Sequence, residues 1–177
     1  MARETFEHTS FGVTYRTKQF SAAYGFRVMG SGLAAIRPTE MLSLTEVRAE
    51  NGEWVRLDNE AAIDAYVRCL AGSLAPRIVL AGVMKVVNKF NWGFLDEWKV
   101  VKIPSRFRSD AQQVSRDNVD PFVSRIVADH YATHRELEEY YSLEDAFKMY
   151  DEICVNTVNK LLQQEQAEID AKSKRGK

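Results

Sequence analysis

The sequence has few cysteines and prolines and no excess of charge of either sign. Its 177 residues include only two cysteines, and the formal net charge is -1. Cys69 and Cys154 lie within apolar helical runs, so two reduced core thiols are favoured over a disulfide or a metal pair, and a reducing cytoplasm is expected. The near-neutral charge argues against a general nucleic-acid binder. The start lacks a signal peptide's apolar core, and no run approaches the roughly 20 apolar residues that span a bilayer, so no membrane role is expected.

Two early stretches alternate apolar and polar residues as β-strands do. Residues 4–17 predict a hairpin with its turn at residues 9–12. Residues 42–57 predict a second hairpin around Asn51-Gly52, the strongest short signal of a hairpin turn in the chain. Between them, Ser21 is expected to cap a short helix that ends at the glycines of residues 30–32.

The middle of the chain predicts two helices. Asp58 or Asn59 caps the first, which should run through Leu70. The second covers residues 75–90 and is apolar on most sides, so we expect it to be buried on most sides as the core of the fold, with Leu80 fully buried. Gly82 would let a neighbouring element approach this helix closely.

A further helix should begin at Asp120-Pro121 and continue through residue 139. It carries the one group of residues that suggests metal or acid–base chemistry: Asp129, His130, His134 and Glu138. The two histidines stand one turn apart, a spacing at which two imidazoles can share a zinc ion, but the glutamate of the metalloprotease motif is missing between them. A solvated histidine pair is therefore favoured, and no metal, cofactor or catalytic residue is assigned.

The last predicted helix organises the chain. Apolar residues recur at steps of three and four from Leu143 to Leu161, behind an N-cap at Ser142 and with Asp145 placed to reach back to the cap. The helix should extend over residues 142–172, beyond a compact body. We therefore expect one globular domain, residues 1–162, and an overhanging helix end with a basic tail, residues 163–177. The predicted fold is α+β and mostly helical, with N-terminal hairpins packed on about five helices and a long C-terminal helix.

Two segments admit a binding role. Trp92 and Phe94 either cover the core or form an exposed aromatic anchor for a partner. The basic residues 99–116 either form a solvated connector that faces acidic side chains, with the segment 99–117 mobile, or touch phosphate or RNA. In the overhang, Gln164 and Ile169 are candidates for contact with a partner. The overhang itself is either a solvated tail or a docking arm.

Two stretches resemble the tail assembly chaperones of tailed bacteriophages. They are residues 11–22, FGVTYRTKQFSA, where that family often has a hairpin ending in a short helix, and Ser142-Leu-Glu-Asp-Ala-Phe with Tyr150, Ile153, Val155 and Asn156, which resembles the family's closing helix. The second hairpin and the basic segment have no counterpart in the resemblance.

The resemblance implies a binding role rather than catalysis. Such proteins cover the tape-measure protein in the host cytoplasm before the tail tube forms, then leave, so they are absent from the mature virion. It also implies self-association. Two alternatives stay open: a structural tail or head-completion subunit that remains in the virion, and a small metal-dependent hydrolase using the histidine pair.

Overall fold

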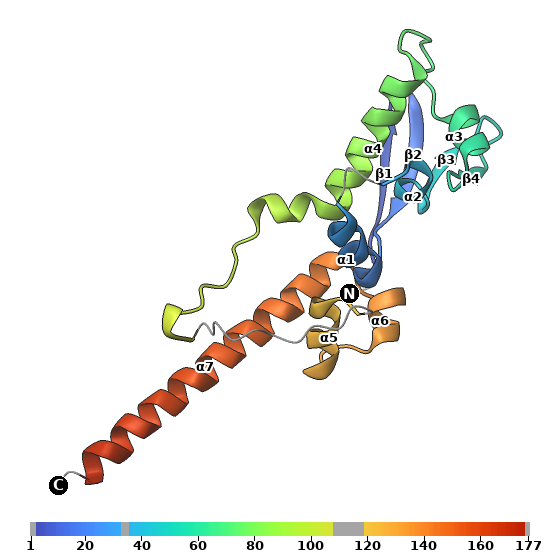
Figure 1. Ribbon diagram of the computed structural model, residues 1–177. Helices are drawn as coiled ribbons and strands as arrows, with labels where there is room; N and C mark the ends of the chain where they lie inside the picture. The colour runs from blue at the N-terminus through green and yellow to red at the C-terminus, as the bar shows by residue number, and fades with distance from the viewer. Residues whose placement is uncertain (1–2, 33–35, 108–118, 176–177) are drawn as a thin grey trace.

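The computed structural model of the chain describes residues 3–32, 36–107 and 119–175. Its fold is α+β and mostly helical, as the sequence predicts (Figure 1). The described residues form one sheet and seven α-helices, which are the helices that the sequence predicts together with short additional ones. The additional helices include α2, Pro38–Met41, and α6, His134–Glu139. Both are too short to show a helical apolar period in the sequence.

The two predicted hairpins are confirmed, and they join into one antiparallel sheet in the order β1-β2-β3-β4. The strands are β1 Thr5–Ser10, β2 Val13–Lys18, β3 Thr45–Arg48 and β4 Trp54–Arg56. Phe11 and Gly12 form the first turn with φ of 55° and 86°. Two positive φ values in a two-residue turn match the right-handed twist of the strands, which explains the tight register of this hairpin.

Helix α4, Pro76–Trp92, packs across the sheet by a single face. Its buried apolar side chains are Val79, Val83, Val87 and Trp92. Ile78 is 49% exposed and Leu80 is only half-buried, so the prediction of a helix buried on most sides is wrong. Besides the sheet, α2 and α7 also contact α4, and Leu80 and Met84 pack against the core in part, whereas Ile78 is exposed.

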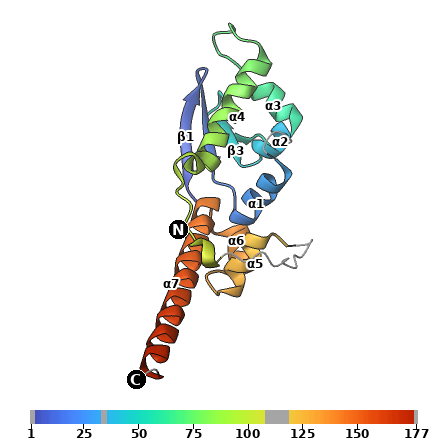
Figure 2. The same ribbon diagram turned by 60° about the vertical axis from the view of Figure 1, so that its left-hand side comes forward.

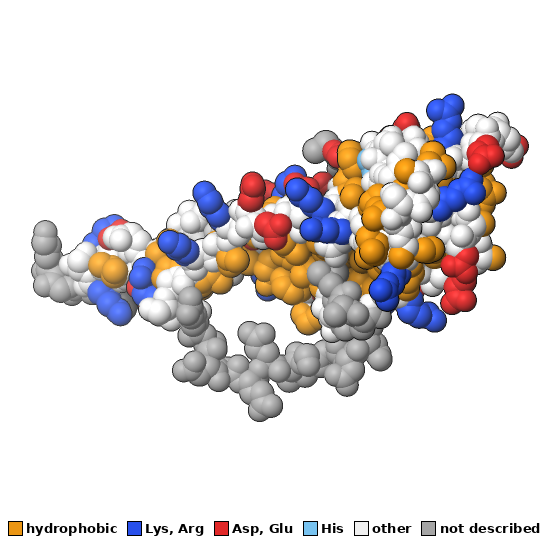
Figure 3. Space-filling model, turned by 90° about the horizontal axis from the view of Figure 1, so that it is seen from above, with side chains coloured by type: hydrophobic (Ala, Val, Ile, Leu, Met, Phe, Trp, Pro, Cys, Tyr) orange, Lys and Arg blue, Asp and Glu red, His pale blue; other side chains and the backbone are white. Residues whose placement is uncertain are grey.

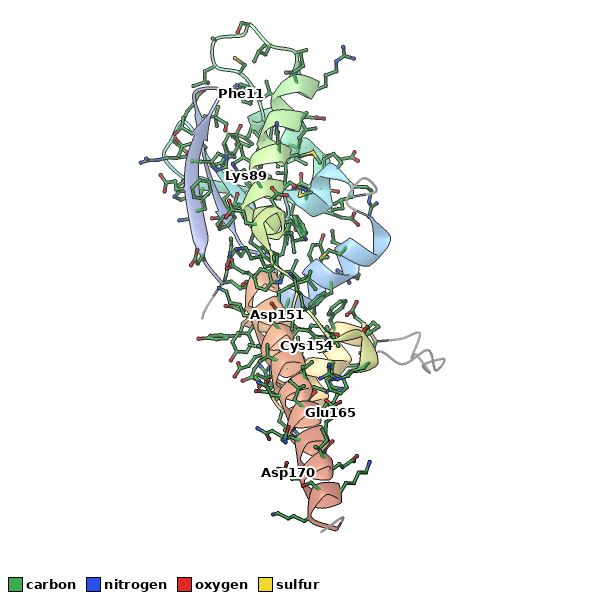
Figure 4. The ribbon with its side chains drawn as sticks, turned by 90° about the vertical axis from the view of Figure 1, so that its left-hand side faces the viewer. Phe11, Lys89, Asp151, Cys154, Glu165 and Asp170 are labelled. Atoms are coloured by element: carbon green, nitrogen blue, oxygen red, sulfur yellow. The ribbon has the colours of Figure 1, made fainter. Side chains whose placement is uncertain are left out.

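The first hairpin approaches α4 closely, as the glycine in this helix predicts. A Cβ built on Gly82 would lie 2.6 Å from the ring of Phe11. Figure 4 shows Phe11 at the turn of the hairpin, beside the first half of α4.

One helical stretch among the described residues, Pro76–Glu97, is long and apolar enough by length and composition to cross a membrane. The sequence analysis expected no stretch of this kind, and Pro76–Glu97 is an exception to that expectation. Core helices of water-soluble proteins pass the same test, and the row Val79, Val83 and Val87 is buried in the body. A single stretch of this kind is weak evidence for a membrane span.

The predicted helix caps are largely confirmed. Ser21 caps α1, Ala22–Ser31, and accepts a hydrogen bond from the backbone N–H of Tyr24. Asn59 caps α3, Glu60–Tyr66, by accepting from the N–H of Ala62 at 2.9 Å. Helix α3 ends four residues before the predicted Leu70. The chain leaves the helical conformation at Val67, whose φ and ψ are -85° and 83°.

The lower half of the molecule contains α5 Pro121–Ala128, α6 and α7 Leu143–Arg175. Helix α1 packs on α6 and α7, and α5 packs on α7. The caps of α1 and α7, Ser21 and Ser142, form an antiparallel bridge. Beside it, a Cβ on Gly25 would lie 3.0 Å from Leu143, so α1 and α7 cross in close contact. This crossing connects the sheet-bearing half to the lower helices.

Candidate functional site

Helix α7 is a single element of 33 residues that projects from the body (Figures 1 and 2). At about 1.5 Å per residue it is roughly 50 Å long. Its start is fixed by the reciprocal bonds that the sequence predicts: the N–H of Asp145 donates to Ser142 Oγ at 3.2 Å, and the N–H of Ser142 donates to Asp145 Oδ2 at 3.1 Å. The C-terminal half of this helix lies outside the body in both views.

An open groove runs along α7 where its core-facing apolar row leaves the body. Leu143, Ala146 and Ile153 of this row are buried, whereas Val158 and Leu161 further along are only half-buried. The groove has a volume of about 400 Å³. It is lined by Ile103, Phe107, Pro121, Arg125, Tyr150, Ile153, Cys154, Thr157, Val158 and Leu161. In Figure 3 the elongated part of the molecule carries charged side chains along one side and a band of apolar side chains along the other.

The far wall of the groove comes from the segment after α4. A 3-10 turn, Ser105–Phe107, is held against α7 by an ion pair between Arg106 Nη2 and Glu165 Oε2 at 3.0 Å. The Arg106 guanidinium also lies 4.8 Å from the centre of the Phe107 ring. On the side of α5, Arg125 Nη2 donates to Thr157 Oγ1 at 3.3 Å. Polar contacts therefore hold the walls, and the floor combines apolar side chains with the hydroxyls of Tyr150 and Thr157.

The titratable groups on the floor of the groove favour their neutral forms. Burial raises the pKa of the Cys154 thiol and of the Tyr150 hydroxyl, so neither group is charged at neutral pH. Nearby, burial also raises the pKa of Asp151, and a hydrogen bond from the Trp98 indole partly offsets this rise. Figure 4 shows Asp151 and Cys154 beside α5 and Glu165 further along α7. Such a surface is suited to binding an apolar partner and has no activated nucleophile.

The structure separates the residues predicted to bind a partner. Trp92 is 4% exposed and packs on Phe20 with ring centroids 5.5 Å apart, so it covers the core and is not an exposed anchor. Phe94 is half-buried against Phe147. Gln164 and Ile169 are both exposed on the projecting part of α7, about 140° apart around the helix. The four side chains do not form one site.

The helix predicted over residues 121–139 is two helices. His130 has a φ of 62° in the turn after α5, and His134 is the first residue of α6. A capping box between Thr133 and Glu136 starts the new helix, a signal that the sequence interpretation missed. The histidines therefore do not share one helical face, and the premise of a zinc-binding pair is wrong. Within the described ranges, no group of three or more His, Cys, Asp or Glu side chains is placed to hold a metal ion.

A second hollow involves two residues of the hydrolase alternative. His134 and Glu138 line a pocket of about 600 Å³ between α1, α5 and α6, which Arg27 and Asp120 also line. Asp120 is the N-cap of α5 and accepts from the N–H of Phe122 at 2.8 Å. His130 and Asp129 lie outside this lining, so the structure does not bring the four candidate residues together.

The basic segment is only partly within the described residues. Arg108, Arg116 and the predicted mobility of residues 108–117 lie outside them. In the described part, Lys99 and Lys102 are exposed, and Arg106 pairs with Glu165. This ion pair agrees with a connector that faces acidic side chains of the same protein.

No family model matches the chain, and comparisons with curated proteins and with solved structures found no match. The observation that bears on function is therefore the groove along α7. Residues 11–22 and the start of α7 meet at the bridge between Ser21 and Ser142.

Proposed function

We propose that this protein is a tail assembly chaperone that binds helical segments of a tape-measure protein before the tail tube forms. The observation that supports the proposal most is the open apolar groove along α7, at the point where its core-facing row leaves the body. A chaperone of a long helical protein needs such a surface because it must cover apolar helix faces and later release them.

The dimensions of the groove suit a short stretch of helix. From Tyr150 to Leu161 its floor extends about 17 Å along α7, which is about three turns of a partner helix. A partner helix with apolar residues at steps of three and four would cover Val158, Leu161 and the facing Ile103. Each contact of this size is weak, so several chaperones bound along one tape-measure protein would hold it through multivalency.

The other parts of the proposal follow from this chaperone role. The protein acts in the host cytoplasm, uses no cofactor, has no catalytic residue and leaves before the virion is complete. A structural tail or head-completion subunit is the second candidate, since a groove of this kind also suits permanent assembly. The hydrolase alternative is weaker because His130 and His134 are on separate elements.

The direct test is co-purification with the product of the long, helix-rich reading frame that should lie immediately downstream. The wild-type chain should retain that product, and Leu161→Glu should lose most of it because a charge on the groove floor would have to be desolvated by the partner. Ala167→Glu is the matched control, since it adds the same charge on a part of α7 that does not line the groove. Ile103→Glu provides a second groove variant on the opposite wall, and thermal melting confirms that each variant folds. Equal retention by Leu161→Glu, Ile103→Glu and the control would overturn the groove as the binding site.

Mass spectrometry of purified virions separates the two binding roles. A chaperone should be abundant in infected cells and missing from mature particles. Stoichiometric recovery from the particles would instead identify a structural subunit and refute the chaperone proposal.

A further inference from the structure

The loop that joins α3 to α4 continues into the first turn of α4 as an exposed and almost uncharged stretch. Residues 70–78 are all exposed, and Arg77 is the one charged residue among them. Leu70, Leu74 and Ile78 are 60%, 39% and 49% exposed. In Figure 1 this stretch lies at the end of the molecule opposite to the C-terminus of α7. We call residues 70–78 the apolar tip.

Contacts with the first hairpin hold the apolar tip in place. The N–H of Leu70 donates to the carbonyl of Phe11 at 3.1 Å, and a Cβ built on Gly12 would lie 3.3 Å from the Leu70 side chain. Pro76 then starts α4 with its φ already in the helical range. The exposure of the tip is therefore a feature of the folded body, and Leu74 lines neither the groove nor the hollow between α1, α5 and α6.

The exposed face of α4 beside the tip is basic. This helix contains no Asp or Glu, and its basic residues, Arg77, Lys85 and Lys89, are all exposed. Ile78, Lys85 and Lys89 lie within about 40° of one another around the helix, so they share one face. None of the three basic side chains forms an ion pair with another described residue. The first carboxylates that follow, residues 96–97, lie at the end of α4 remote from the tip.

We propose that the apolar tip and the basic face of α4 together bind the surface of a lipid bilayer that carries anionic headgroups. Leu74 and Ile78 enter the boundary between headgroups and acyl chains, while Lys85 and Lys89 lie against lipid phosphates. Apolar and basic side chains on one surface are typical of helices that lie in a bilayer interface. The contact is peripheral and not a span, because the opposite face of α4 is buried in the body. This role goes beyond the sequence analysis, which expected no membrane role.

The composition of this surface favours lipid over nucleic acid. Proteins that bind single-stranded nucleic acid combine basic side chains with exposed aromatic rings on which the bases stack. Residues 70–89, which hold the tip and the basic face, contain no Phe, Tyr or Trp. The large exposed side chains are aliphatic instead, and their charged neighbours match the negative potential of anionic lipids.

Sedimentation of the purified full chain with lipid vesicles tests the proposal. The chain should sediment with vesicles of equal parts phosphatidylcholine and phosphatidylglycerol, and it should stay in the supernatant with phosphatidylcholine alone. Binding should fall at least tenfold as the salt rises from about 0.01 M to about 1 M, because the Debye length shortens from about 30 Å to about 3 Å. Equal binding to both kinds of vesicle, or binding to neither, would overturn the proposal.

Charge reversal tests the basic face. Lys85→Glu combined with Lys89→Glu should weaken binding to the anionic vesicles by about tenfold or more. Lys172→Glu combined with Lys174→Glu is the matched control, since it makes the same change in net charge at two exposed positions of α7. This control should bind as the wild-type chain does. An equal loss in both double variants would show that binding follows net charge alone, and would refute α4 as the contact.

A second pair of variants tests the apolar tip. Leu74→Ser combined with Ile78→Ser should weaken binding several-fold, because aliphatic side chains no longer enter the bilayer. Leu162→Ser combined with Ile169→Ser removes exposed apolar side chains from α7 and should change nothing. Thermal melting confirms that each variant folds. If the tip variant binds as the wild type does while charge reversal abolishes binding, the surface is a general polyanion site, and the bilayer proposal is wrong.

These measurements need only the chain and vesicles, so their outcome is separate from that of the groove. The charge-reversed variant of α4 should still retain the product of the downstream reading frame, because neither Lys85 nor Lys89 lines the groove. Loss of that product together with loss of vesicle binding would mean that α4 contacts the protein partner, and would overturn a separate lipid surface.

Discussion

Asn91 is the buried polar residue that links the end of the first hairpin to α4. Its Oδ1 accepts from the N–H of Phe20 at 2.7 Å, and its Nδ2 donates to the carbonyl of Val87 at 2.9 Å. Asn91→Ala would leave the buried N–H of Phe20 without its acceptor, so we expect a loss of about 1–3 kcal/mol in the free energy of unfolding. Urea denaturation measures this loss. Asn88→Ala on the same helix is the control, and a loss no larger than the control's would show that the bond to Phe20 contributes nothing.

His8 supplies a pH-dependent contribution to stability. Its ring stacks on Phe6 and Tyr15 at centroid distances of 5.4 and 5.5 Å, and its two nitrogens are shielded from solvent without a described hydrogen-bond partner. Burial lowers the pKa of His8 below its ordinary value. The unfolded chain therefore binds a proton at His8 more readily than the folded chain does. The stability that the neutral His8 ring contributes to the fold is complete above the pKa of about 6.5 that His8 has in the unfolded chain. It is lost as the pH falls through the lower pKa of His8 in the folded chain.

We therefore expect the melting temperature of the wild-type protein to fall on acidification from about pH 7.5 to about pH 5.5, and to fall less in His8→Phe. Phenylalanine keeps the stacked ring and removes the titrating group. Thermal melts of both proteins across this range measure the difference. Identical falls in the two proteins would mean that the imidazole is hydrated and titrates normally in the folded state.

At the scale of single elements, α7 divides into a half that the fold needs and a half that it does not. Ile153 is 4% exposed, so Ile153→Asp would bury an unpaired charge and should cost enough stability to unfold much of the protein. Removing residues 164–177 deletes side chains that are mostly exposed over residues 164–174, and it deletes the Arg106–Glu165 pair, whose partners are about half exposed. Such pairs contribute about 0–1 kcal/mol, so the melting temperature should barely change. Strong destabilisation by the truncation would mean that the projecting half belongs to the core.

The elements were predictable where a local signal marks them. The Asn51-Gly52 turn, the caps at Ser21 and Ser142 and the Asp120-Pro121 start specify backbone geometry within a few residues, and each is confirmed. The break between α5 and α6 was not predicted, since apolar spacing continues across it and only the Thr133 capping box marks the new start. The burial of α4 was overestimated because apolar composition does not tell which sides a neighbour will cover.

The site depends on tertiary arrangement that no local pattern encodes. The apolar row of α7 was readable from its spacing, but the partner walls of the groove, Ile103 and Phe107, come from an irregular segment with no period.

The whole molecule exposes more surface than a compact protein of its size. Its accessible surface is 12226 Å², whereas a compact monomer of 20.2 kDa would expose about 8,800 Å². The excess accompanies an elongated shape in which α7 stands apart from the sheet-bearing half (Figure 2). A chain that leaves the apolar row of α7 only half-buried at Val158 and Leu161 is suited to completing its packing on partners.

The most direct test of the central claim is photo-crosslinking from inside the groove during tail assembly. A benzophenone amino acid replaces Leu161, and a control chain carries it at Ala167, which does not line the groove. The account predicts that mass spectrometry of the crosslinked species from position 161 identifies peptides of the tape-measure protein, and that position 167 yields few or none. Crosslinks from position 161 to a different virion protein, or equal yields from the two positions, would contradict the claim that this groove holds the tape-measure protein.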